Sequence, residues 1–173
     1  MAGTSGTAGT GGSERGLLGI YLNDHLAGAT AGVDLFRRAA APHRGSELGN
    51  TLERLLAEVA EDRTALLDMM NVLGVPVRRY KVYAAWAAEK AGRLKLNGHL
   101  LKRSPLSTLV ELEAMRLGVE GKEAGWRTLK IVADRNGRID ATRLDGLLTR
   151  ARQQAETLEE LRVAAAARVF GGA

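Results

Sequence analysis

Polar side chains interrupt the apolar helix faces of this chain at His25, Asp62, Glu113, Glu120 and Gln154. Each stands in a series of apolar residues spaced three and four apart, which is the spacing of one face of a helix. An unpaired buried carboxylate costs several kcal/mol, so these side chains should meet one another or a bound group. Two kinds of chemistry follow: a hydrogen-bonded network or a metal site.

The first hypothesis is a buried polar network that fixes the register of the helices. Its members are His25, Asp62, Glu113, Glu120 and Gln154. In this hypothesis His25 faces Asp62 near the middle of an antiparallel helix pair, and Glu113 pairs with an arginine. The candidate arginines are Arg116, Arg127 and Arg152.

The second hypothesis is a metal or cofactor site. Its ligands would be His25, Glu58, Asp62, Glu113 and Glu120. Carboxylates and imidazole suit iron and manganese. However, Glu113 and Glu120 are two helical turns apart, about 10.5 Å along the axis, which is too far for both to hold one ion directly. The sequence therefore favours a chain without a cofactor and leaves iron or manganese as the metals to test.

No catalytic residue is assigned from the sequence. The chain has no cysteine, which excludes disulfides, thiolate catalysis, thiolate zinc sites and iron–sulfur clusters. No Ser–His–Asp grouping is readable, and nothing orients a nucleophile. The sequence therefore favours a protein that is not an enzyme.

The positive charge of the chain is concentrated between residues 77 and 105. Its basic residues are Arg78, Arg79, Lys81, Lys90, Arg93, Lys95, Lys102 and Arg103, and Glu89 is the only acid among them. With Trp86 and nearby tyrosines, this segment is either a solvated connector or a surface for acidic membranes. Nucleic acid is the less favoured partner, because no nucleic-acid-binding motif accompanies the charge.

Four long helices are expected to position these side chains. The helix formers Ala, Leu, Arg and Glu are frequent among the 173 residues and aromatic residues are 4%, which favours helices over a β-sandwich. The periodic stretches are 16–41, 46–74, 104–134 and 140–170. Ser46, Ser104 and Asp140 are the expected N-caps, and Gly74 the expected C-terminal stop. The turn at 134–140 resembles a calcium loop, but Arg143 stands where a bidentate Glu is required.

The third helix carries two apolar faces, which predicts burial on more than one side. One face contains Leu106, Val110, Glu113, Leu117, Glu120, Ala124 and Ile131, and the other contains Leu109, Leu112, Val119 and Trp126. The first helix has a patch of small residues around Gly28 and Gly32. We expect a tight helix contact or a dimer seam there, with a ligand-sized void as the alternative.

The connector lengths predict the topology. Short turns make helices 1 and 2, and helices 3 and 4, antiparallel neighbours, whereas the crossover 75–104 lets helix 3 run parallel to helix 2. This crossover should contain a short helix at 82–92. Residues 1–15 are predicted to be a flexible Gly, Thr and Ser-rich tail, and 16–173 a single domain. The tail lacks the features of a secretory signal, so we expect a cytoplasmic protein.

This all-α, four-helix-bundle layout resembles the ferritin-like superfamily over most of residues 16–170. The resemblance implies paired iron or manganese held by Glu and Glu-x-x-His residues, but Glu-x-x-His does not occur in this chain. We therefore expect a non-enzymatic bundle that acts as a homodimer or through a protein partner, which the sequence does not identify. A metal-binding carboxylate bundle and a peripheral membrane protein are the alternatives.

Overall fold

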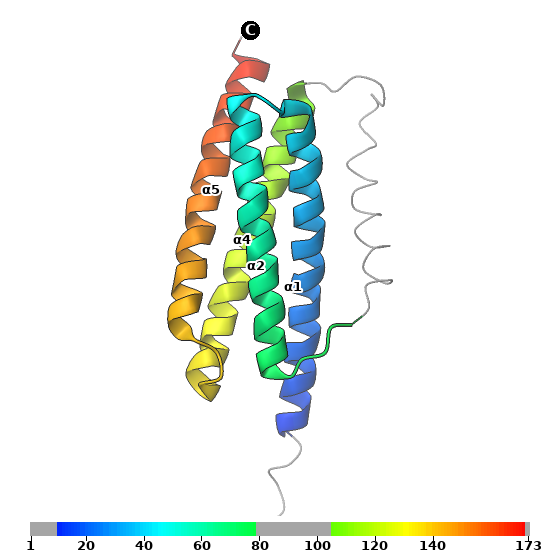
Figure 1. The fold of residues 1–173 in the computed structure, drawn as a ribbon, viewed down its shortest axis with the longest axis vertical. Helices are drawn as coiled ribbons and strands as arrows, with labels where there is room; N and C mark the ends of the chain where they lie inside the picture. The colour runs from blue at the N-terminus through cyan, green and yellow to red at the C-terminus, as the bar shows by residue number, and fades with distance from the viewer. Residues whose placement is uncertain (1–9, 79–104, 172–173) are drawn as a thin grey trace, which may run out of the picture.

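The computed structural model describes residues 10–78 and 105–171, and in these ranges the chain forms a four-helix bundle without strands (Figure 1). The helices are α1 (Thr10–Ala40), α2 (Glu47–Leu73), α4 (Pro105–Asn136) and α5 (Ala141–Phe170), with a short 3-10 helix, η1 (Ala41–His43), after α1. The predicted all-α fold class is confirmed. No helix in the described ranges is long and apolar enough to cross a membrane.

The helix ends follow from local chemistry. The Ser46 hydroxyl accepts a hydrogen bond from the Gly49 N–H at 3.1 Å, and the Asp140 carboxylate accepts one from the Thr142 N–H at 2.8 Å. Each bond satisfies an N–H group that the first turn of a helix leaves unpaired. Gly74 ends α2 in the left-handed conformation, with φ of 70°. These three predicted boundary residues are confirmed.

The start of α1 differs from the sequence prediction. The helix begins at Thr10, so residues 10–15 are helical rather than part of a flexible tail. Glycine and threonine are poor helix formers, but once the following turns are nucleated each added residue gains a hydrogen bond. Residues 1–9, the predicted short helix at 82–92 and the predicted cap Ser104 lie outside the described residues.

The helix directions match the predicted crossover topology. Helices α1 and α2 are antiparallel, α4 and α5 are antiparallel, and α2 and α4 run in the same direction (Figure 1). The most extensive packing lies within the two pairs, and α1 also packs against α4. Direct packing between α2 and α5 is slight. The bundle is thus two helical hairpins joined mainly through α1 and α4.

The core is formed by apolar stripes from all four helices. Its fully buried large side chains are Phe36, Leu22 and Leu26 from α1, Leu52, Leu55 and Met70 from α2, Leu112, Met115 and Leu129 from α4, and Leu144 and Leu158 from α5. The buried residues of α2 include Leu52, Leu55, Val59, Asp62, Leu66 and Met69, which are spaced three and four apart along one face. Asp62 lies on that face, so the core must accommodate its charge.

Only one of the two apolar faces of α4 is buried, which corrects the prediction of burial on both sides. Leu109, Leu112, Val119 and Trp126 face the core. On the other face, Leu117 is 67% exposed and Ile131 is 57% exposed. The neighbours α1 and α5 cover the first face and leave the second to solvent. We call the exposed apolar residues of α4 the outer stripe: Leu106, Leu117, Ala124 and Ile131.

Candidate functional site

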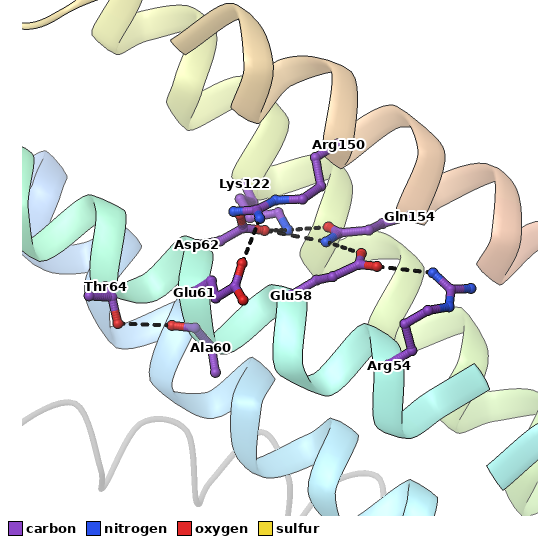
Figure 2. A network of polar contacts seen from close by, with 9 residues as sticks. All are labelled: Arg54, Glu58, Ala60, Glu61, Asp62, Thr64, Lys122, Arg150 and Gln154. Carbon is purple, nitrogen blue, oxygen red and sulfur yellow. Dashed lines mark hydrogen bonds and ion pairs between the residues drawn. The ribbon is translucent and has the colours of Figure 1, made fainter. Parts of the chain in front are cut away.

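A polar network occupies the centre of the bundle, where α2, α4 and α5 meet (Figure 2). Asp62 of α2 and Gln154 of α5 are each only 1% exposed. The Asp62 carboxylate accepts a hydrogen bond from Lys122 Nζ at 2.5 Å, and its other oxygen accepts one from Arg150. Lys122 also donates to the Gln154 side-chain oxygen. The network therefore connects three helices through one buried carboxylate.

The network continues from the core to the surface. The Gln154 amide donates to Glu58 Oε2 at 2.9 Å, and Arg54 donates to the other oxygen of Glu58 at 3.0 Å. Arg150 donates to Glu61 at 2.8 Å. Helices α2 and α5, which pack little against each other directly, are thus held by charged and amide groups.

The charges in the buried part of this network are unequal. One carboxylate, Asp62, faces two cations, Lys122 and Arg150. Burial lowers the pKa of Lys122, and Arg150 lowers it further, while Asp62 and Glu58 act in the opposite direction. Lys122 has three N–H donors, of which the two bonds to Asp62 and Gln154 use two. The network therefore leaves one N–H donor on Lys122, while Glu61 supplies a second carboxylate to Arg150 near the surface.

A half-open cavity of about 320 Å³ lies beside this network, between α1, α2 and α4. Asp62 and Lys122 contribute to its wall, together with His25 and Arg63. Most of the remaining wall is apolar or glycine. Its glycines are Gly28, Gly118, Gly121 and Gly125.

Three of these glycines leave space rather than allow close helix packing. A Cβ atom added at Gly28, Gly118 or Gly121 would meet no atom within 4 Å, and the same holds for Gly32. The tight contact within the chain expected at Gly28 and Gly32 is therefore wrong. Two interpretations of the small residues at Gly28 and Gly32 remain: a void for a ligand, and a contact surface for a second copy of the chain.

His25 reaches the cavity, but it does not form the predicted pair with Asp62. Its ring packs against Tyr21, with 4.4 Å between ring centroids, and a Cβ at Gly125 would come within 2.9 Å of its Nδ1. Burial lowers the pKa of His25, and the nearby Asp24 opposes this change. Asp62 instead bonds Lys122 of α4 and Arg150 of α5, because these long side chains reach it across the core.

Glu113 and Glu120 lie on the exposed side of α4, so their predicted place in the buried network is wrong. Glu120 pairs with Arg116 at 3.2 Å, and Glu113 lies 4.0 Å from Arg162. Arg116 also pairs with Glu159, and the other two candidate arginines, Arg127 and Arg152, both pair with Glu123. The error arose because these acids share a stripe with Leu117 and Ile131, which is itself exposed.

The predicted metal ligands are therefore dispersed. Glu113 and Glu120 are on the surface, while Glu58 and Asp62 are held by cations and by Gln154. In the described ranges, no three His, Asp or Glu side chains come together as a metal site would require. The Lys122 ammonium lies between Asp62 and Gln154, the two buried oxygen donors that a cation would otherwise join.

Three residues of the polar interior were not predicted: Lys122, Arg150 and Asn23. A signal existed for Lys122, which stands seven residues from both Met115 and Leu129 on the buried face of α4. Arg150 is four residues before Gln154, one turn along the same face of α5. Asn23 is 2% exposed, donates to the Pro76 carbonyl at 3.1 Å and accepts from the Arg78 N–H at 2.7 Å.

The basic segment is described only at its first member. Arg78 is exposed after the end of α2, next to the Asn23 contact. The other residues of the set, Arg79, Lys81, Lys90, Arg93, Lys95, Lys102 and Arg103, lie outside the described ranges. Binding of this segment to an acidic membrane stays a prediction.

Comparison of the chain with protein-family models, with curated proteins and with solved structures finds no significant match. The network, the cavity and the outer stripe are therefore the features of the described residues that bear on function.

Proposed function

We propose that this protein is a non-enzymatic helical bundle that acts as a homodimer through the outer stripe of α4. The observation that carries the proposal is the exposure of Leu117 and Ile131, at 67% and 57%, on an apolar face with helical periodicity. Glu113 and Glu120 lie between apolar side chains of the outer stripe, and large apolar side chains exposed together on one helix face mark interaction sites in soluble proteins. The bundle uses the opposite face of the same helix for its own core.

A second copy of the chain can cover the outer stripe with its own outer stripe. When two α4 helices lie antiparallel about a two-fold axis between residues 120 and 121, Leu117 of each copy faces Ala124 of the other, and Val110 faces Ile131. A two-fold interface is self-complementary in this way. Gly121 would lie at the crossing point, and the free space around it permits close approach of the two helices.

The double variant Leu117→Glu/Ile131→Glu tests this proposal. Analytical ultracentrifugation of the full, tag-free chain should give a dimer for the parent and a monomer for the variant. Val163→Glu is the matched control, because Val163 is also exposed, at 51%, but lies on α5. A monomeric parent, or equal dissociation by the control, would contradict the proposal.

Disulfide trapping tests the antiparallel register. The chain has no cysteine, so introduced thiols are the only ones present. The variant Leu117→Cys/Ala124→Cys should form an interchain disulfide on oxidation. The two positions are about 10.5 Å apart within one helix, too far to be bridged in the same chain. Leu117→Cys alone should remain reduced, and its efficient crosslinking would contradict the register.

We further propose a relationship to the ferritin-like superfamily, supported by the parallel α2 and α4 that link two antiparallel hairpins. The proposed relationship brings no metal chemistry, because the ligand set is dispersed. A paired site holds about two metal ions per chain. Elemental analysis of protein purified without chelator should find a metal content well below this value. About one or two equivalents of iron or manganese would contradict this prediction.

A further inference from the structure

We propose that the cavity between α1, α2 and α4 is a binding site for a small apolar anion, a ring compound that carries one carboxylate or sulfonate group. The cavity adjoins the outer stripe at Gly121, but most of its wall comes from α1, α2 and other residues of α4, and the proposal does not depend on dimer formation. Four observations support it: the volume of the cavity, its charge, an unpaired indole N–H and the open space at its glycines.

The volume favours a small molecule over a protein segment. At about 320 Å³ the cavity is within the range of small-molecule sites, near its lower end. One turn of a helix with its side chains, roughly 10 Å wide and 5.4 Å high, occupies about 420 Å³. The apolar part of the wall, with Leu22, Val59, Leu66, Leu129 and the indole of Trp126, suits a ring.

The charge of the wall favours an anion. Lys122 is paired with Asp62 and retains one N–H donor, whereas Arg150, the other cation on Asp62, is also paired with Glu61. Arg63 also lines the cavity, and its Nε donates to the Thr30 hydroxyl at 2.9 Å. No carboxylate of the described residues is bonded to Arg63. The wall also carries two carboxylates: Asp62, which is bonded to Lys122, and Asp24, an exposed residue beside His25.

The indole of Trp126 provides the third observation. Trp126 is 2% exposed, and its Nε1 is buried without a hydrogen-bond partner in the part of the chain that the structure describes. Buried polar groups are almost always paired in native proteins, so an orphaned donor requires an explanation. Because less than 1 Å² of Nε1 is accessible, an oxygen of an acidic ligand in the adjoining cavity would supply the missing acceptor only with a movement of the indole.

The glycines provide the fourth observation and the means to test the site. Gly28 of α1 and Gly118 of α4 both line the cavity. A Cβ added at either glycine would have no other atom within 4 Å. A leucine at either position therefore places its Cβ without a clash and adds side-chain volume at the cavity wall. Gly146 on α5 has the same free space but does not line this cavity, so it serves as the matched control.

A pair of fluorescent probes tests both parts of the proposal on the full, tag-free chain. 1-Anilinonaphthalene-8-sulfonate is the apolar anion, and N-phenyl-1-naphthylamine is the same molecule without the sulfonate. The parent should bind the anion about tenfold more tightly, as expected for a hydrogen-bonded charged group. Gly28→Leu and Gly118→Leu should weaken both probes more than about tenfold, whereas Gly146→Leu should change neither. Circular dichroism confirms that each variant is folded.

Charge variants then separate the anion site from apolar adsorption. Arg63→Gln leaves the Asp62 network intact and should weaken the sulfonate probe about tenfold without affecting the neutral probe. Lys122→Gln should act in the same direction. Equal binding of the two probes, or unchanged binding by folded Gly28→Leu and Gly118→Leu, would overturn the proposal. Loss of binding in Leu117→Glu would also overturn it, because the probe would then be on the outer stripe.

Discussion

Asp62 is the residue on which the polar interior depends. It is a single buried carboxylate bonded to Lys122, Arg150 and Gln154, which come from two other helices. The Coulomb attraction in such a group mainly offsets the loss of hydration, so the whole network contributes little net stability. Removal of one member has a much larger effect, because it leaves the others buried and uncompensated.

The substitution Asp62→Asn should therefore be strongly destabilising. With the carboxylate gone, two cations are left without a buried counter-charge, and the free energy of unfolding should fall by about 3–5 kcal/mol. Urea unfolding followed by circular dichroism measures this change. Asp68→Asn is the control, since Asp68 pairs with Arg143 at the surface, and its loss should cost about 1 kcal/mol or less. Equal effects would show that burial of the charge is unimportant.

His25 makes stability depend on pH below neutrality. Burial lowers its pKa from the ordinary value of 6.5, with Asp24 opposing. The unfolded chain therefore binds a proton at this residue more readily than the folded chain, and stability falls as the pH drops below about 6.5 towards the folded-state pKa. In the variant His25→Gln, the loss of stability that His25 causes at acidic pH should disappear. Melting temperatures of the parent and the variant, measured at several pH values, test this. If the dependence of melting temperature on pH is the same in the variant, groups other than His25 cause the loss of stability at acidic pH.

At the scale of the helices, glycines on α4 have opposite roles. Gly118→Ala should raise the free energy of unfolding by about 0.5–1 kcal/mol, because it gains helix propensity without a contact. Gly125→Ala brings a Cβ to 2.9 Å from the His25 ring, which Tyr21 already confines, and should lower it by about 1–3 kcal/mol. Urea unfolding of the two variants checks the difference in sign. Stabilisation by Gly125→Ala would show that the ring moves freely.

The helix boundaries were largely predictable because local chemistry determines them. Ser46, Gly74 and Asp140 act through bonds to residues a few positions away, which are visible in the sequence. The buried face of α4 was not predictable. Periodicity finds both apolar faces of that helix, but packing by α1 and α5 decides which one is buried, and that is a tertiary effect.

The candidate site was predicted in part for a related reason. Asp62 and Gln154 were found because they interrupt apolar stripes that do face the core, whereas Glu113 and Glu120 interrupt one that does not. Lys122 and Arg150 were missed because long cationic side chains usually extend to solvent, although their stems can pack against a core. The cavity was named only as an alternative at Gly28, since the sequence does not show whether a glycine faces a neighbour or a space.

At the scale of the whole molecule, the proposed dimer surface and the proposed anion site should respond differently to salt. The outer stripe is apolar, so raising the ionic strength from about 0.1 M to about 1 M should leave dimer formation unchanged or stronger. The same change should weaken binding of the sulfonate probe, since charge attraction is screened. Ultracentrifugation and fluorescence titration in the same buffers measure both. Parallel weakening would indicate that one charged surface serves both processes.

The open glycines of the cavity also have an evolutionary consequence. Gly28, Gly118 and Gly121 lie inside helices with room for a methyl group, and alanine at all three would add about 1.5–3 kcal/mol. That is a large fraction of the roughly 5–15 kcal/mol that holds a domain folded. A lineage selected for folding alone would drift towards alanine at these positions. Laboratory selection for thermostability alone should therefore fill them early, and the empty space should close as the protein becomes more stable.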